Sequence, residues 1–164
     1  MRARWLLILA AVAIAAGTSC SRDPNVAKRR YLESGNRYFE KGKFREASIM
    51  YRSALKKDPR YGDAYYKLGL TALRINDPVS AERALRRAFE LLKPGPERND
   101  SASKLTDIYL AVYLADTRRG KTYETELDDF MKRLPQGSFD RLRIEGLRAA
   151  KNGDLDGALK SLEA

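Results

Sequence analysis

Three short segments of the chain have residue types and spacings that could carry chemistry. Ser101 and Lys104 have the Ser-x-x-Lys spacing used by enzymes that form an acyl-serine. Residues 152–163 place Asn and Asp side chains before Gly157, and Glu163 follows this glycine by six residues, which is the spacing of a calcium-binding loop. Asp128 and Asp129 form a carboxylate pair, a residue combination that can perform general acid and base work.

The composition argues against catalysis at these segments. The 164 residues include no His and one Cys, which excludes His-based acid and base chemistry, a disulfide framework and a thiolate metal cluster. No Ser-Asp-Asn or Lys-Thr-Gly partner accompanies the Ser-x-x-Lys segment, so Ser101 or Ser103 is interpreted as a helix N-cap. Asp128 and Asp129 are expected on a solvated helix face. We therefore expect no enzymatic activity, no cofactor and no small-molecule substrate.

The segment with calcium-loop spacing has a second interpretation as the turn between two helices. A calcium loop would need a further helix after Glu163, and its first ligand would be Asn152 instead of Asp. Calcium-dependent binding through residues 152–163 is the less favoured alternative, and no metal site is predicted.

The N-terminus has the pattern of an export signal. Arg2 and Arg4 are its only charged residues, and residues 5–16 form an unbroken apolar run. This run is shorter than the roughly 20 apolar residues that a transmembrane helix needs, and it matches the length of a secretory signal. Residues 1–19 are therefore predicted to be a signal peptide.

Small residues and the only cysteine follow the apolar run. Gly17, Thr18, Ser19 and Cys20 resemble the end of a bacterial lipoprotein signal, although that family prefers Leu where this chain has Gly17. The resemblance implies cleavage before Cys20 and its acylation, and Ser21 implies sorting to the outer membrane. Two or more acyl chains hold a protein durably on a bilayer. Residues 20–27 are then a lipid-anchor cysteine and a tether, and the alternative is a soluble periplasmic or secreted protein.

A repeat of 34 residues organises the next part of the chain. Each unit has small residues at helical spacing, and turn residues stand where two helices must reverse direction: Gly42 in the first unit, and Asn76 and Asp77 in the second. Small residues allow two antiparallel helices to approach closely. The pairs that recur 34 residues apart are Tyr31 and Tyr65, Gly35 and Gly69, Ala47 and Ala81, and Ala54 and Ala88.

These residues resemble the tetratricopeptide repeat (TPR). The resemblance is strong in residues 28–61 and 62–95, which read as two units, and looser in 96–137, a divergent helical hairpin, and 138–164, a partial unit. Ser34 departs from the pattern, where Leu is usual. The implied fold is all-α, a right-handed superhelical solenoid of antiparallel helix hairpins. Because the last unit stops within its second helix, we expect a truncated chain or an end that packs on another molecule.

In TPR proteins the first helices of the hairpins line a concave face that binds an extended peptide or a helix of a partner. The resemblance therefore implies a partner-binding groove, formed here by Arg29, Leu32, Asn36, Phe39, Glu40, Tyr66, Lys67, Leu70, Leu73 and Arg74. Asn36 resembles one residue of a clamp for carboxylates, but Leu32 stands where that clamp has lysine.

Positive charge is concentrated in the first unit. The chain has 32 Lys and Arg against 22 Asp and Glu, and residues 28–61 alone hold 11 basic and 4 acidic side chains. A membrane-anchored first unit would face anionic headgroups or acidic envelope polymers, and the alternative is a solubilising face of Lys and Arg. Export makes nucleic acid an unsuitable partner. The leading hypothesis is an exported, lipid-anchored scaffold for a protein partner, similar to TPR proteins of envelope or exopolysaccharide assembly. The alternative is a truncated regulatory module of a larger envelope enzyme.

Overall fold

The computed structural model describes residues 23–115 and 120–163, and this part of the chain contains helices and no strand. The predicted signal peptide, residues 1–19, and the predicted lipid-anchor Cys20 lie outside the described residues. The helices are α2 (Pro24–Glu40), α3 (Phe44–Lys57), α4 (Gly62–Arg74), α5 (Pro78–Leu91), α6 (Pro96–Leu114), α7 (Gly120–Arg133), α8 (Phe139–Lys151) and α9 (Leu155–Glu163).

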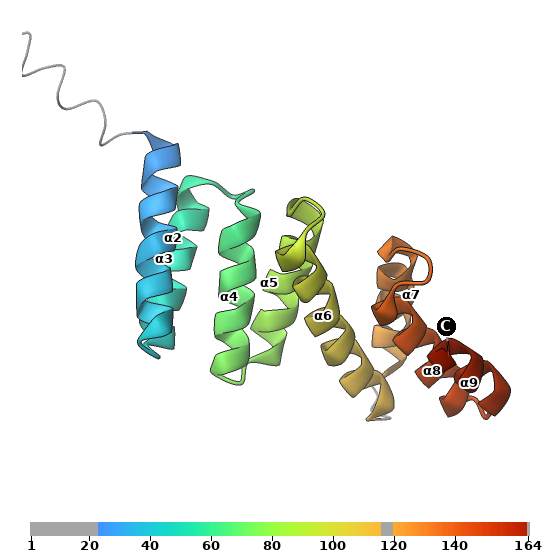
Figure 1. Cartoon of the computed structure of the whole chain (residues 1–164). Helices are drawn as coiled ribbons and strands as arrows, with labels where there is room; N and C mark the ends of the chain where they lie inside the picture. The colour runs from blue at the N-terminus through green and yellow to red at the C-terminus, as the bar shows by residue number, and fades with distance from the viewer. Residues whose placement is uncertain (1–22, 116–119, 164) are drawn as a thin grey trace, which may run out of the picture.

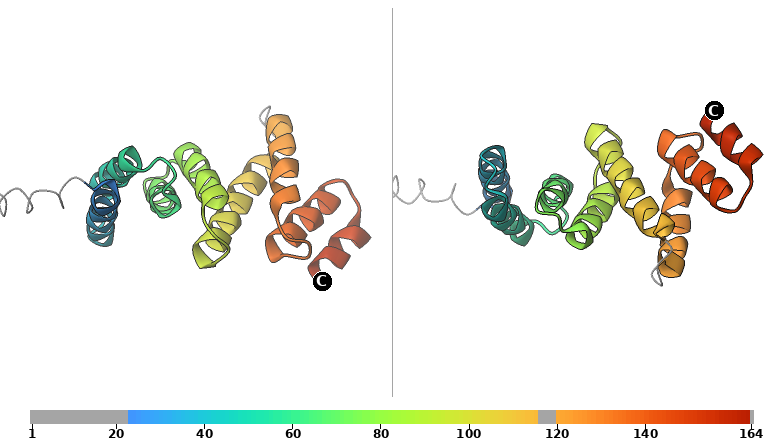
Figure 2. Two further views of the ribbon diagram at one scale, coloured as in Figure 1. Left: turned by 90° about the horizontal axis from the view of Figure 1, so that it is seen from above. Right: turned by 90° about the horizontal axis from the view of Figure 1, so that it is seen from below.

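The helices pair into antiparallel hairpins that stack in a row. Figures 1 and 2 show α2 at one end of an elongated molecule and α9 at the other. The strongest packing is between the two helices of each of the hairpins α2/α3, α4/α5 and α8/α9. Successive hairpins then pack through α3 with α4 and through α5 with α6. The expected all-α solenoid of helix hairpins is confirmed.

The repeated glycines are the points of closest approach within the first two hairpins. A Cβ atom at Gly35 would lie 2.6 Å from Cδ1 of Tyr51, and one at Gly69 would lie 2.7 Å from Cγ of Leu85. Such separations are too short for any residue but glycine, since side chains in a packed core have little room to move. The prediction that small residues let these helices approach closely is confirmed.

The turns inside the hairpins use residues that tolerate a left-handed backbone. Gly42 has φ +70° between α2 and α3, and Asn76 has φ +57° between α4 and α5. Asn adopts this conformation more readily than most residues, and Gly does so without steric cost. The sequence predicted the reversals at these positions.

Two helices begin earlier than the sequence suggested. Asp23 caps α2 by accepting a hydrogen bond of 2.8 Å from the backbone N–H of Asn25, and Pro24 occupies the first turn. The prediction of a tether was therefore wrong for residues 24–27. In the same way α6 begins at Pro96, which places Ser101 and Ser103 inside the helix. Their assignment as N-caps was wrong, because a proline in the first turn begins a helix without losing a hydrogen bond.

The core runs continuously from α4 to α8. Aromatic rings replace the small residues in the hairpin of α6 and α7: the ring centroid of Phe130 lies 5.4 Å from those of both Phe89 and Tyr109, in edge-to-face geometry. The buried members of this cluster are Ala72, Ala81, Leu85, Phe89, Ala102, Leu105, Tyr109, Leu110, Tyr113, Leu127, Phe130, Leu134 and Ile144. The divergent hairpin is therefore part of one continuous core.

The segment with calcium-loop spacing forms the turn between α8 and α9, in residues 152–154, and the whole of α9. Asn152 follows the end of α8, Gly153 has φ +82°, and an Asp154 carboxylate oxygen accepts a hydrogen bond of 2.9 Å from the N–H of Gly157. Among the described residues, no three acidic, cysteine or histidine side chains gather in a way that could hold a metal ion. This geometry supports the interpretation as a helix turn.

Candidate partner-binding groove

A groove of about 430 Å³ lies across the first helices of three successive hairpins. Its walls come from α2, α4 and α6, and α4 contacts both of the other two helices. The residues that line it are Phe39, Tyr66, Leu70, Leu73, Arg74, Asp100 and Lys104. The structure thus brings five of the ten groove residues predicted from the sequence into one cavity and adds two from α6.

The groove has an apolar part formed by α2 and α4. Phe39, Leu70 and Leu73 are half-buried, so each keeps apolar surface open to a ligand. The ring of Phe39 is fixed by edge-to-face packing on Phe44, with the ring centroids 5.3 Å apart. A fixed aromatic wall with aliphatic neighbours is suited to accept an apolar side chain at a low cost in ordering.

A polar network closes the α6 side of the groove. The hydroxyl of Tyr66 donates a hydrogen bond of 2.9 Å to Asp100, and the ammonium of Lys104 lies 3.1 Å from the other oxygen of the same carboxylate. Burial, together with the hydrogen bond to Asp100 and its charge, raises the pKa of Tyr66 to about 12. Tyr66 therefore stays neutral at physiological pH and presents a fixed ring and hydroxyl to the groove.

Arg74 supplies an accessible cation at the groove. Its side chain is exposed, and it forms no ion pair within the described residues. Lys104 is held by Asp100, so Arg74 is the more available of the two cations that line the cavity. A carboxylate of a bound chain could pair with this guanidinium.

The other five predicted residues do not line this cavity. Asn36 accepts a hydrogen bond of 2.9 Å from the hydroxyl of Tyr51, so its amide oxygen supports the first hairpin. Arg29 is exposed and donates to the carbonyl of its own helix, while Glu40 is exposed and Leu32 half-buried. The ammonium of Lys67 lies 5.6 Å from the centre of the Tyr66 ring, beside the groove.

Asp100 and Lys104 were missed because the third unit departs from the consensus. They nevertheless lie 34 residues after Tyr66 and Leu70, two residues that were predicted to line the groove. Continuing the period of 34 into α6, instead of searching it for the consensus residues, would have found both.

A buried polar network elsewhere in the stack was also missed. Glu82 on α5 is buried, accepts a hydrogen bond of 3.2 Å from the hydroxyl of Tyr109, and pairs with Arg86. A buried carboxylate needs such partners, and the network joins the second hairpin to the third. It stabilises the stack that holds the groove.

The comparisons with known proteins agree with this architecture. A family model described as TPR repeat matches residues 35–75. The human protein named "TPR and ankyrin repeat-containing protein 1" is 28% identical over 78 residues, which are 48% of this chain and 2% of that protein's length. A solved structure, that of a thermophilic TPR protein from Thermus thermophilus, matches with a TM-score of 0.51 at 25% identity, over 84% of this chain and 72% of that one.

Fold and comparisons together show a stack of helix hairpins similar to that of TPR proteins. Residues 35–75 match the TPR repeat model, and the described residues form a TPR-like solenoid. Within the described residues no helix has the length and apolar character needed to cross a membrane.

Proposed function

We propose that the protein is a non-enzymatic scaffold whose groove binds an extended segment or a helix of a protein partner. The observation that carries this proposal is the cavity of about 430 Å³ lined jointly by α2, α4 and α6. An apolar wall beside an available cation suits a segment that combines a large apolar side chain with an acidic one. The TPR-like solenoid supports this function, because such stacks present extended binding surfaces.

The groove can be tested with peptides selected from a random display library against the full chain. Selected peptides should lose at least about tenfold in affinity with Leu73→Asn, because the variant places an amide in the apolar part of the groove. Ile49→Asn is the matched control, since Ile49 is 58% exposed on α3 and does not line the groove. Equal affinities for the two variants, measured by fluorescence anisotropy, would contradict the proposal.

We further propose that the scaffold is exported and anchored in the bacterial outer membrane through acylated Cys20, facing the periplasm. The support comes from the sequence of residues 1–21: two arginines, an apolar run and small residues before the only cysteine. Envelope or exopolysaccharide assembly is the setting in which such a scaffold would act.

The anchor can be tested by intact-mass analysis after expression in a bacterial host with the native N-terminus. We expect a chain that begins at Cys20 and carries the added mass of acyl groups, and the Cys20→Ser variant should lack this added mass. An unmodified mature polypeptide in both preparations would contradict the lipid anchor and favour the alternative of a soluble periplasmic or secreted scaffold.

A further inference from the structure

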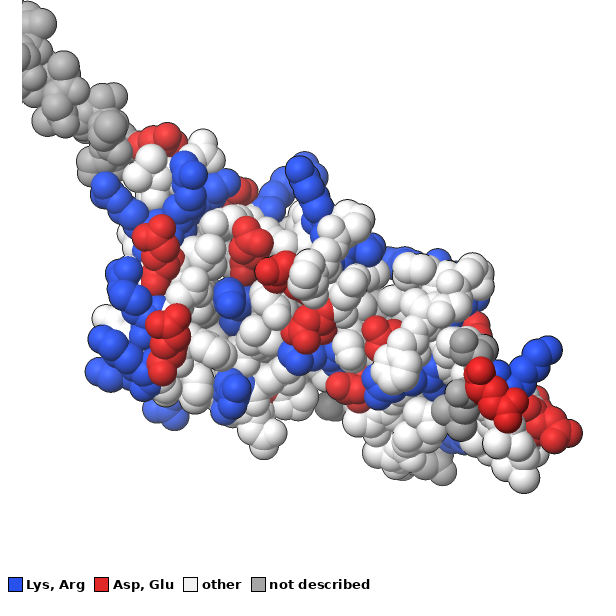
Figure 3. Space-filling view, in the orientation of Figure 1, with Lys and Arg blue, Asp and Glu red and all other residues white. Residues whose placement is uncertain are grey.

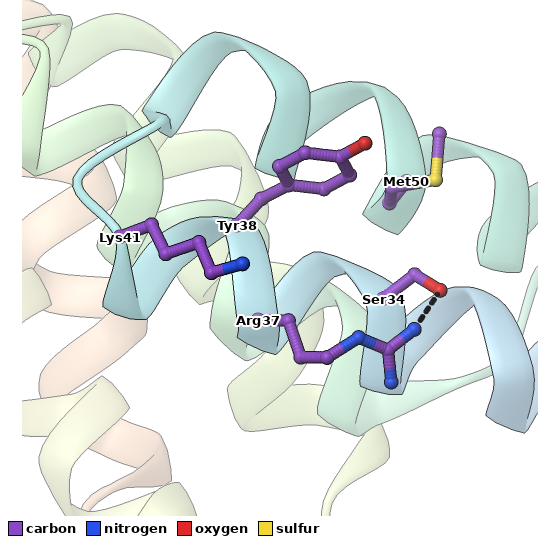
Figure 4. Close-up of a pocket in the computed structure, with 5 residues that line it drawn as sticks. All are labelled: Ser34, Arg37, Tyr38, Lys41 and Met50. Atoms are coloured by element: carbon purple, nitrogen blue, oxygen red, sulfur yellow. Dashed lines mark hydrogen bonds between the residues drawn. The ribbon is translucent and has the colours of Figure 1, made fainter.

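A second pocket lies on the outer face of the first hairpin, away from the groove. It has a volume of about 260 Å³ and is lined by Ser34, Arg37, Tyr38, Lys41 and Met50 (Figure 4). One side of the pocket is formed by α2 and the residue after it, which contribute Ser34, Arg37 and Lys41. The Tyr38 ring extends toward Met50 of α3. The pocket therefore has a cationic side and an apolar side.

The repeat shows that this face has a different composition from its counterpart inside the stack. The positions 34 residues after Arg37, Tyr38 and Met50 lie in the second hairpin and hold small residues. These small residues are at most 4% exposed, and the first hairpin packs on the second. The larger side chains at these positions of the first hairpin belong to a face that no other hairpin covers in the described stack. The buried counterparts are Thr71, Ala72 and Ala84.

The cations of this pocket are not neutralised by the described residues. Neither Arg37 nor Lys41 forms an ion pair within them, and no carboxylate lines the pocket. Of the 11 basic side chains in residues 28–61, Lys28 alone is paired with a described carboxylate, that of Asp58. Figure 3 shows Lys and Arg gathered over this end of the molecule. The local potential therefore favours an anion.

The donors in the pocket are suited to a phosphate group. Ser34 Oγ accepts a hydrogen bond of 2.8 Å from Arg37, which holds the guanidinium in place and leaves its other N–H groups open. The Lys41 ammonium supplies further donors, whereas the Tyr38 hydroxyl lies on the Met50 side of the pocket (Figure 4). Arginine forks match the oxygens of phosphate better than a point charge does. The Tyr38 ring and Met50 offer apolar surface to the organic part of an ester.

We propose that this pocket binds a phosphate ester, with Arg37, Lys41 and Ser34 around the phosphate and with Tyr38 and Met50 against its organic group. The ester can belong to the headgroup of an anionic phospholipid or to a small soluble molecule, and both present the same chemistry. This site is separate from the partner-binding groove, so failure of one proposal leaves the other standing.

The test compares two double variants of the full chain with equal loss of charge. Arg37→Gln with Lys41→Gln removes the cations of the pocket, whereas Arg52→Gln with Lys56→Gln removes two exposed cations of α3 that do not line it. Calorimetric titration with glycerol 3-phosphate at constant ionic strength should show saturable binding. We expect binding at least about tenfold weaker in the pocket variant and nearly unchanged in the control, since hydrogen bonds to charged groups are the stronger ones.

Vesicles distinguish the two sources of the ester. For each protein, binding to phosphatidylcholine vesicles is compared with binding to vesicles that also contain phosphatidylglycerol. A lipid ligand is supported if phosphatidylglycerol increases vesicle binding and this increase falls in the pocket variant but persists in the control. A soluble ligand is supported if the pocket variant loses affinity for glycerol 3-phosphate alone. Equal losses in both double variants, or no saturable binding of either probe by the parent chain, would overturn the proposal. Circular dichroism checks that each variant is folded.

Discussion

The contact between Gly69 and Leu85 gives the sharpest test of how the stack is held together. A Cβ at position 69 would lie 2.7 Å from Cγ and 2.8 Å from Cδ2 of Leu85, which is fully buried. Both atoms belong to the part of Leu85 that Leu85→Ala removes. The two substitutions should therefore compensate each other when they are combined.

The magnitudes can be worked from these contacts. Overpacking by Gly69→Ala costs about 1–3 kcal/mol, and the gain in helix propensity returns about 1 kcal/mol. Leu85→Ala alone costs about 2–5 kcal/mol, because it leaves a cavity. In the Leu85→Ala background, the Cβ introduced by Gly69→Ala no longer overlaps Cγ and Cδ2 of residue 85, and the gain in helix propensity remains. The backbone nitrogen of residue 85 still lies 3.3 Å from this Cβ. We expect a coupling free energy of about 1–3 kcal/mol.

The assay is a double-mutant cycle in urea unfolding, followed by far-ultraviolet circular dichroism. Gly69→Ala should destabilise the parent chain and stabilise the Leu85→Ala variant. Gly146→Ala is the control for helix propensity, because its nearest atoms would be Ser161 Cβ at 3.3 Å and the Ala158 carbonyl at 3.5 Å. If Gly69→Ala lowered stability by the same amount in both backgrounds, the proposed steric contact would not be what requires glycine there.

Three other side chains give independent tests of the packing. The pKa of Tyr66 is raised to about 12 by burial and a neighbouring carboxylate. The protonated hydroxyl therefore makes its full contribution to the free energy of unfolding below about pH 10, and this contribution is lost as pH rises toward 12. Urea unfolding should show a smaller loss of stability at alkaline pH in Tyr66→Phe than in the parent chain. Tyr109→Phe should lower stability by about 1.5–3 kcal/mol, because it removes a hydrogen bond to the buried carboxylate of Glu82, and a loss below about 0.5 kcal/mol in thermal unfolding would contradict this account. Asp77, the N-cap of α5, accepts a hydrogen bond of 3.0 Å from Ser80, and hydrogen bonds from Ser80 lower its pKa. Asp77→Ala should lower the free energy of unfolding by about 1 kcal/mol at neutral pH. In urea unfolding, this difference between variant and parent should vanish as pH falls below the lowered pKa.

The hairpins were predictable because their small residues have a steric role at fixed spacing. Gly35 and Gly69 lie against Tyr51 and Leu85, and no larger residue fits there without displacing these side chains. Such a requirement leaves a pattern in the sequence that can be read without a structure. The same holds for the turns, where Asn76 adopts a backbone conformation that few residues tolerate.

The helix beginnings were less predictable, because proline can either begin a helix or interrupt one. Pro24 was read as part of a tether, and the helix that begins at Pro96 was expected to begin near Ser101, yet each proline occupies the first turn of a helix, as Pro78 also does. A proline in the first turn loses no intrahelical hydrogen bond, whereas one in the interior breaks the helix. Spacing alone does not distinguish the two positions when the preceding residues lack a helical pattern.

The groove was half predictable for a related reason: its position follows the repeat, but its chemistry does not. Phe39 and Leu73 occupy equivalent positions in successive units and both are apolar, whereas the positions of Tyr66 and Leu70 become Asp100 and Lys104 one unit later. The register of the helices is thus kept while the lining changes from apolar to charged along the stack. A bound segment would therefore have a direction, with its apolar side chains against α2 and α4 and its polar ones toward Arg74 and α6. Exchange of the two charges, Asp100→Lys with Lys104→Asp, should leave the fold intact and alter the peptides selected for that end alone.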